Sequence, residues 1–109
     1  MASVAGFEGQ KGQVVYAASK GAIIAMTLPM ARDLGKYKIR VMSLAPGIIE
    51  TPMGDGVPTK IGEMLNKSTP LGRIGKPNEF AVAVEGIVKS TFATGSTWRL
   101  DGGIRLPYL

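Results

Sequence analysis

The chain has 109 residues, 45% hydrophobic and 19% charged, which indicates one small globular domain and excludes an intrinsically disordered chain. It contains neither cysteine nor histidine, which excludes disulfides, a thiolate site and a histidine-based triad and disfavours a zinc site. The net charge of +5 is compatible with an anionic partner such as a dinucleotide, but the basic residues form no dense cluster. No apolar run reaches the length of a membrane span, and no targeting segment is visible.

The N-terminal part of the chain predicts the end of a strand, a turn region and a long helix. Residues 2–5 have the pattern of a buried strand, and the glycines within residues 6–12 are interpreted as turn glycines. Residues 15–34 predict a helix that is kinked or loosened at Pro29 and ended by Gly35. The predicted apolar face of this helix consists of Ala17, Ala18, Ala22, Ile23, Met26, Met30, Ala31 and Leu34.

The rest of the chain predicts two more strands, with a long connection and a helix between them. Residues 39–45 predict a strand covered on both faces, and residues 96–100 predict the last strand. Residues 47–77 form an irregular stretch with a short helical pattern at about 59–66, which is typical of a lid. Pro77 suits the first turn of a helix that continues to about residue 89. This alternation predicts an α/β fold with about three parallel strands, two long helices and a short lid helix.

Ser3, Tyr16 and Lys20 are the strongest candidates for a catalytic group. Tyr16 lies thirteen positions after Ser3, and Lys20 lies four after Tyr16, which places the phenol and the ammonium on one face of the predicted helix. A phenol ordinarily titrates at about 10, and a neighbouring cation favours the phenolate. A serine hydroxyl beside the phenol adds a hydrogen-bond donor for a substrate oxygen. Together these residue types suggest chemistry between a carbonyl and an alcohol.

The pattern Ser-x12-Tyr-x-x-x-Lys resembles the catalytic signature of the short-chain dehydrogenase/reductase family. Two later segments, Pro46-Gly-Ile-Ile-Glu-Thr51 and Leu100-Asp-Gly-Gly103, resemble further motifs of that family in the same order. The resemblance covers nearly the whole chain, but only the C-terminal half of a family member. It implies that residues 1–109 are a partial domain, the C-terminal part of a Rossmann-like doubly wound parallel sheet whose N-terminal nucleotide-binding half is missing.

The same resemblance implies hydride transfer between NAD and the 3-hydroxy or 3-keto group of an acyl-CoA or a hydroxysteroid, with NADP as an open alternative. Ser3 would hold the substrate oxygen, Tyr16 would exchange its proton, and Lys20 would support the phenolate and bind the nicotinamide ribose. The expected cofactor-binding residues are Tyr16, Lys20, Pro46, Gly47, Ile49 and Thr51. The expected substrate-binding residues are Ser3, Tyr16 and Met53, the last of them in a lid at about residues 47–77.

The resemblance also implies partners: the missing N-terminal half and, in intact members, further copies in a homo-oligomer, a tetramer, that packs through the last helix and strand. We expect no nucleic acid or membrane among the partners, and a location in the cytoplasm or the mitochondrial matrix. A second hypothesis stays open, in which the chain is a truncated, non-catalytic interaction module that docks onto intact subunits. Binding of NAD by the chain would separate the two.

Overall fold

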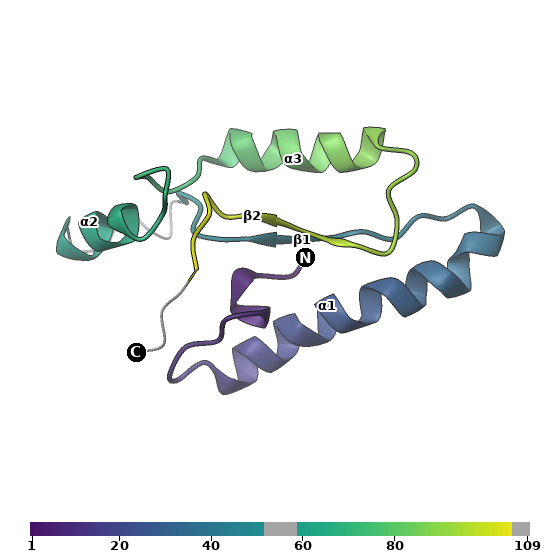
Figure 1. The fold of residues 1–109 in the computed structure, drawn as a ribbon, viewed down its shortest axis with the longest axis horizontal. Coiled ribbons are helices and arrows are strands. Elements are labelled where there is room, and N and C mark those ends of the chain that lie inside the picture. Colours follow the sequence, from purple (N-terminus) through teal and green to yellow (C-terminus); the bar gives the residue numbers. More distant parts are fainter. Residues whose placement is uncertain (52–58, 106–109) are drawn as a thin grey trace.

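A small parallel sheet forms the centre of the computed structural model, which describes residues 1–51 and 59–105 (Figure 1). Strand β1 (Ser43–Pro46) pairs in parallel with β2 (Thr97–Leu100), with Ser43 opposite Thr97. The hydroxyls of these two residues lie 2.6 Å apart and hydrogen-bond across the ladder. The sheet therefore confirms the parallel pairing that the sequence predicts.

Helices lie on both sides of this sheet. Helix α1 (Val14–Leu34) lies on one side and α3 (Pro77–Lys89) on the other, while the short α2 (Thr59–Lys67) lies beyond the carboxyl ends of the strands (Figure 1). Parallel strands need a crossover connection, and α3 lies in the connection between β1 and β2. The predicted α/β class is thus confirmed.

The N-terminal segment differs from the prediction. Residues 2–5 do not form a strand, because Val4–Gly6 form a 3-10 helix, η1, whose first turn Ser3 caps. Ala2 pairs with β1 as a strand residue would, because its N–H donates to the carbonyl of Leu44 at 2.9 Å. The sheet consequently has two strands among the described residues rather than about three. Strand β1 also begins four residues later than expected, at Ser43.

Helix α1 has about the predicted length, and its predicted apolar face is confirmed in part: Ala31 is buried, and Ala17, Ile23, Met30 and Leu34 are half-buried. It passes through Pro29 without a break, and its buried residues are Thr27 and Ala31, whereas Ala22 and Met26, predicted to be buried, are exposed. Since apolar residues occur all round this helix, periodicity could not select its inner side. The left-handed residue after the helix is Lys38, with φ 62°, and not Gly35, which continues into a second 3-10 helix, η2 (Gly35–Tyr37).

Helix α1 corrects the expectation that no apolar run reaches the length of a membrane span. The 24 helical residues Val14–Tyr37 contain an 18-residue window with a mean hydropathy of 1.4 and are, by length and composition alone, long and apolar enough to cross a membrane. One such helix is weak evidence for a membrane span, because the core helix of a soluble protein and a signal sequence pass the same test.

The turn that follows β2 packs against the segment that follows α2. Gly102 and Gly103 have φ angles of 61° and 84°, a left-handed conformation that glycine adopts without strain. A Cβ at Gly103 would lie 2.9 Å from Cγ of Pro70, so this turn and the segment at Pro70 approach closely. Beyond it, Gly75 forms a parallel bridge with Ile49. Both contacts anchor the C-terminal end of the lid region against the sheet.

Candidate active site

Tyr16 and Lys20 form a pair on one face of α1, as their spacing predicts. The ammonium of Lys20 lies 5.7 Å from the centroid of the Tyr16 ring, within the range of a cation–π contact. The ring is 47% exposed, so a substrate can reach it from solvent. The hydroxyl of Ser19 donates to the carbonyl of Tyr16 at 2.7 Å and is thereby engaged with the helix backbone.

Ser3 is oriented by its role as the N-cap of η1. Its Oγ accepts a hydrogen bond from the N–H of Ala5 at 3.1 Å. Because that bond uses a lone pair of the oxygen, the hydroxyl hydrogen of Ser3 is left to donate elsewhere, for example to a substrate oxygen. The cap therefore suits the predicted role of this residue.

Two glycines bring the segment that follows Ser3 against α1. A Cβ at Gly6 would lie 2.9 Å from the backbone carbon of Lys20, and a Cβ at Gly9 would lie 2.8 Å from Cβ of Ala17. Both glycines serve close packing, which corrects their interpretation as turn glycines; among residues 6–12 only Gly12 has a positive φ, 81°. The packing places η1 beside the turn of α1 that carries Lys20. That the hydroxyls of Ser3 and Tyr16 lie within hydrogen-bonding distance of each other stays a prediction.

Four of the expected cofactor-binding residues line one open groove of about 430 Å³ at the carboxyl end of β1. Its lining residues are Met1, Pro46, Gly47, Ile49, Thr51, Pro77 and Phe80. Ligands in open α/β sheets bind at this edge. The largely apolar walls and the Thr51 hydroxyl fit a flat ring that carries an amide, such as nicotinamide.

The groove connects to the Tyr16 and Lys20 pair through Met1. The Lys20 ammonium donates to the carbonyl of Met1 at 3.4 Å, and Met1 is one of the groove residues. Lys20 thus shares Met1 as a neighbour with this groove, and Lys20 itself is not among the groove's lining residues. For Gly47 it also shows a packing role, because a Cβ there would lie 2.9 Å from Cβ of Asp101.

A second groove, of about 410 Å³, lies between α2 and the segment that follows β1. Its lining is mixed: Leu65 and Ile74 are apolar, while Asn66 and Lys76 are polar. Met53, the expected substrate-binding residue of the lid, lies outside the described residues.

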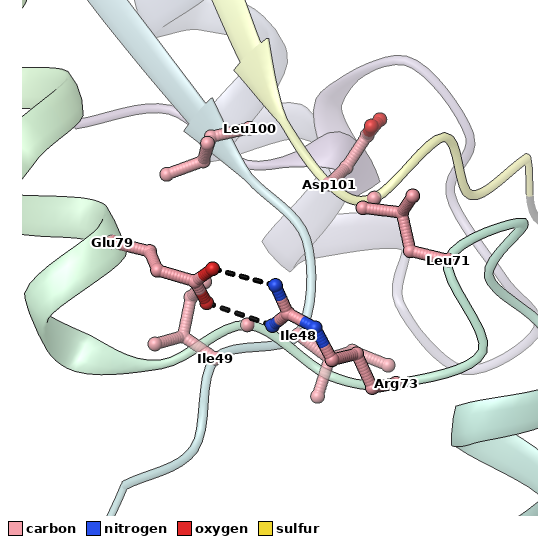
Figure 2. Close-up of a pocket in the computed structure, with 9 residues that line it drawn as sticks. Ile48, Ile49, Leu71, Arg73, Glu79, Leu100 and Asp101 are labelled. Carbon is pink, nitrogen blue, oxygen red and sulfur yellow. Dashed lines mark hydrogen bonds and ion pairs between the residues drawn. The ribbon is translucent and has the colours of Figure 1, made fainter.

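A small cavity of about 80 Å³ shares Ile49 with both grooves and has on its wall an ion pair that the sequence analysis did not identify (Figure 2). Arg73 donates to both carboxylate oxygens of Glu79, at 2.8 and 2.6 Å. The hydrogen bond from Arg73, together with one from the N–H of Lys76, lowers the pKa of Glu79 to about 2. Glu79 is the third residue of α3, after Pro77 and Asn78, which is the usual position of a capping-box acid. That position is the sequence signal that could have identified Glu79.

Comparisons with known proteins agree with these motifs. A family model described as enoyl-(acyl carrier protein) reductase matches residues 1–105. The human 3-hydroxyacyl-CoA dehydrogenase type-2 is 49% identical over 106 residues, which are 96% of this chain and 41% of that protein. The chain thus spans about two fifths of the length of the curated relatives it matches.

Solved structures show the same fold. The crystal structure of 3-hydroxyacyl-CoA dehydrogenase type-2 from Mycobacterium avium superposes with a TM-score of 0.94 and 39% identity, over 97% of this chain and 42% of that one. A 3-oxoacyl-[acyl-carrier protein] reductase with bound NAD from Brucella melitensis superposes with a TM-score of 0.84 and 37% identity, over 97% of this chain and 39% of that one.

Proposed function

This chain belongs to the short-chain dehydrogenase/reductase family, and we propose that it is the catalytic part of an NAD-dependent oxidoreductase that acts on the 3-hydroxy or 3-keto group of an acyl-CoA or a hydroxysteroid. The observation that carries the proposal is the Tyr16 and Lys20 pair, whose ammonium also reaches Met1 at the groove of Pro46, Gly47, Ile49 and Thr51. NADP is an alternative cofactor.

In the proposed mechanism each of the three residues has one task. Tyr16 takes the proton of the substrate hydroxyl at its Oη during oxidation and returns it during reduction. Ser3 donates its hydroxyl hydrogen to the same substrate oxygen and so holds it beside the phenol. Lys20 places a positive charge next to the phenol, where it stabilises the phenolate that receives the proton. NAD, when bound, supplies the acceptor for the hydride that leaves the substrate carbon.

The groove residues would hold the nicotinamide end of the cofactor. Thr51 offers a hydroxyl to the carboxamide, Pro46 and Ile49 offer apolar surface to the ring, and Gly47 keeps the backbone close to it. We place Met53 and the lid at about residues 47–77 over the substrate. The remaining parts of the dinucleotide would contact a polypeptide that supplies the rest of the family fold.

We also propose that the assembled protein is a homo-oligomer, a tetramer, that packs through α3 and β2, where Val82 is 65% and Trp98 39% exposed. A location in the cytoplasm or the mitochondrial matrix suits a cysteine-free chain that gains nothing from an oxidising compartment. The comparisons do not favour a non-catalytic docking module, because the named relatives are dehydrogenases and reductases.

The test combines the chain with a polypeptide that covers the remaining part of the family fold. We expect NADH absorbance to rise when NAD and a 3-hydroxyacyl-CoA are added together, and the same assay with a hydroxysteroid ranks the two substrate classes. Assembly of the two polypeptides without any turnover of either substrate would contradict the proposal.

A further inference from the structure

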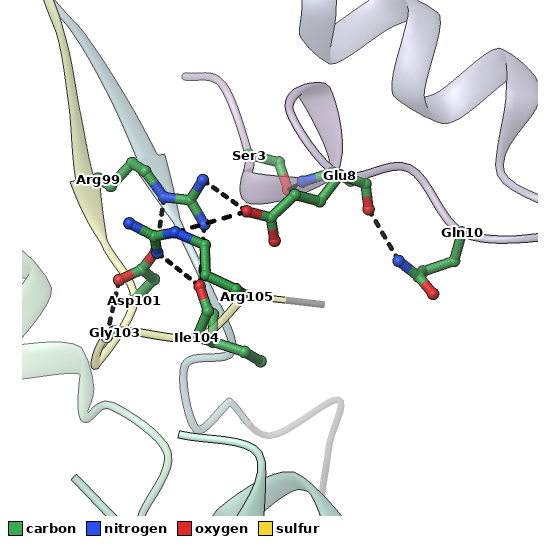
Figure 3. Close-up of polar contacts among 9 residues, drawn as sticks. Ser3, Glu8, Gln10, Arg99, Asp101, Gly103, Ile104 and Arg105 are labelled. Atoms are coloured by element: carbon green, nitrogen blue, oxygen red, sulfur yellow. Dashed lines mark hydrogen bonds and ion pairs between the residues drawn. The ribbon is translucent and has the colours of Figure 1, made fainter. Parts of the chain in front are cut away.

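Arg99 in β2 joins the turn that follows β2 to the distant segment at Glu8 through its guanidinium group (Figure 3). Nε donates to Asp101 Oδ2 at 2.6 Å, one terminal nitrogen donates to Glu8 Oε1 at 2.8 Å, and the other donates to the carbonyl of Ile104 at 3.0 Å. The side chains of Arg99, Glu8 and Asp101 are 20%, 18% and 8% exposed, so these contacts are largely shielded from solvent. A shielded, multiply bonded arginine holds its partners far more firmly than a surface ion pair does.

The contact with Glu8 reaches the segment that Ser3 caps. Glu8 follows η1 closely, its N–H donates to the carbonyl of Val4 at 2.9 Å, and its own carbonyl accepts from the side-chain amide of Gln10 at 2.9 Å. The Arg99 guanidinium also lies 5.1 Å from the centroid of the Phe7 ring. Arg99 thus contacts both residues that follow η1 directly.

Asp101 keeps Arg99 in place. Burial favours the protonated form of Asp101, but the hydrogen bonds from Arg99 and from the N–H of Gly103, together with the charges of Arg99 and Arg105, outweigh it, and the net effect lowers the pKa of Asp101. Arg105 is 63% exposed and donates to Asp101 at 3.1 Å from the rim of the cluster. Arg99 is therefore the central member and Arg105 a peripheral one.

A three-residue 3-10 helix is too short to hold a defined position by itself. On one side Gly6 approaches α1 closely, and Val4 and Ala5 of η1 are buried. On the other side the contacts include those of Arg99 with Phe7 and Glu8, of Arg105 with Glu8 at 3.8 Å, and of Ala2 with Leu44. We propose that Arg99, acting through Glu8, is a positioning residue for Ser3, which it holds at the place where the hydroxyl meets the substrate oxygen. This inference rests on the proposed function for the role of Ser3.

The first experiment measures hydrogen exchange in the 109-residue chain and needs no activity. In Arg99→Lys, which keeps the charge but cannot make three directed bonds, we expect the amides of Ala5 and Glu8 to exchange at least about tenfold faster. The amides in the middle of α1 serve as the internal reference and should change less than about twofold. Arg99→Met should give a larger effect at Ala5 and Glu8, and Arg32→Met, at an exposed arginine of α1, is the matched control and should give none.

Unchanged exchange at Ala5 and Glu8 in both Arg99 variants would overturn the inference, and so would an equal acceleration throughout α1 and α3. The second experiment uses the two-polypeptide assembly of the proposed function. There Arg99→Lys should lower kcat at least about tenfold with an unchanged KM for NAD, because Ser3 and not the cofactor groove is displaced. An assembly that is inactive with the unaltered chain would contradict the proposed function while the exchange result still decides the position of Ser3.

Discussion

Among the described residues, two lysine and tyrosine pairs have similar distances between the ammonium and the ring, and their surroundings distinguish them. The ammonium of Lys36 lies 5.0 Å from the Tyr37 ring, and that of Lys20 lies 5.7 Å from the Tyr16 ring. Only the Lys20 ammonium also bonds Met1 at the groove, whereas Tyr37 is in η2, after the C-terminal end of α1. A lysine beside a tyrosine is therefore a candidate catalytic pair only where a ligand-binding groove lies next to it.

Tyr16→Phe should lower kcat of the assembled enzyme at least about 100-fold, because it removes the exchangeable hydroxyl and nothing else. Tyr37→Phe is the matched control and should leave turnover unchanged. The measurement is NADH formation at saturating substrate, with the circular dichroism of each variant recorded alongside it. Near-normal turnover in Tyr16→Phe would refute the assignment of the proton relay.

Gly6→Ala should destabilise the chain by about 1–3 kcal/mol, since the new methyl group would meet the backbone of α1 and force the two segments apart. Gly86 in α3 is the matched control, because a Cβ there meets nothing within 4 Å. Gly86→Ala should instead stabilise the chain by about 0.5–1 kcal/mol. The urea concentrations at the unfolding midpoints of the two variants test these two predictions. Midpoints that shift in the same direction for both variants would contradict them.

At the scale of elements, the C-terminal end of α3 is closed by a side chain from the segment before β1. One terminal nitrogen of Arg40 lies 3.1 Å from each of the carbonyls of Ile87, Ser90 and Ala93, and the other lies 2.8 Å from that of Val88. The carbonyls of Ile87 and Ser90 also accept backbone N–H groups, from Ser90 and Ala93, so Arg40 adds a second donor there. A cation at this end also offsets the negative end of the helix dipole. Arg40 thus joins α3 to the chain that enters the sheet.

Arg40→Met should lower the free energy of unfolding by about 1–3 kcal/mol, because it removes four hydrogen bonds to carbonyls, three of them partly buried, and the cation at the end of the helix. Lys89→Met, which removes an exposed ion pair with Glu85 in the same helix, is the control and should cost less than about 0.5 kcal/mol. Thermal unfolding followed by circular dichroism compares the two. Equal losses would show that the carbonyls of α3 are satisfied without Arg40.

The ion pair of Arg73 and Glu79 joins the end of the lid region to the start of α3, and its pH dependence follows from the lowered pKa of Glu79. A carboxyl whose folded pKa is depressed contributes stability above its ordinary value of 4.5, and that contribution is lost as pH falls toward about 2. Carbon NMR of the Glu79 carboxyl should therefore show a midpoint of about 2. In Arg73→Met the midpoint should rise toward the ordinary value, and a midpoint that stays low would assign the shift to another donor.

At the scale of the whole molecule, the chain leaves much apolar surface uncovered. Phe92 is fully exposed, and Val14 and Val15 at the start of α1 are 81% and 82% exposed. Among the described residues the buried apolar ones are few and mostly small: Ala2, Val4, Ala5, Ala31, Leu44, Ala45 and Ile104. A chain that spans about two fifths of its relatives' length has too little core to cover these faces by itself.

The 109-residue chain alone should self-associate and should not bind NAD with micromolar affinity. Micromolar binding needs about 8 kcal/mol, and the groove of Pro46, Gly47, Ile49 and Thr51 offers contacts for one end of the dinucleotide only. Sedimentation velocity measures the self-association, and titration calorimetry measures the affinity for NAD. Tight NAD binding by a monomeric chain would contradict both.

Local features of the sequence determined the long helix from Val14, the helix from Pro77, the last strand and the placement of Tyr16 and Lys20 on one helix face, because each depends on spacing within a few turns of backbone. The tertiary structure decided the rest. Which side of α1 is buried, why Gly6 and Gly9 are glycines, and why Arg99 binds Glu8 all depend on contacts between segments that are distant along the chain. An apolar helix or a lone arginine carries no local mark of such a partner. The strand expected at residues 2–5 became η1, because Oγ of Ser3 accepts the N–H of Ala5, a local contact, and because Gly6 packs against α1, a contact that only the folded chain provides.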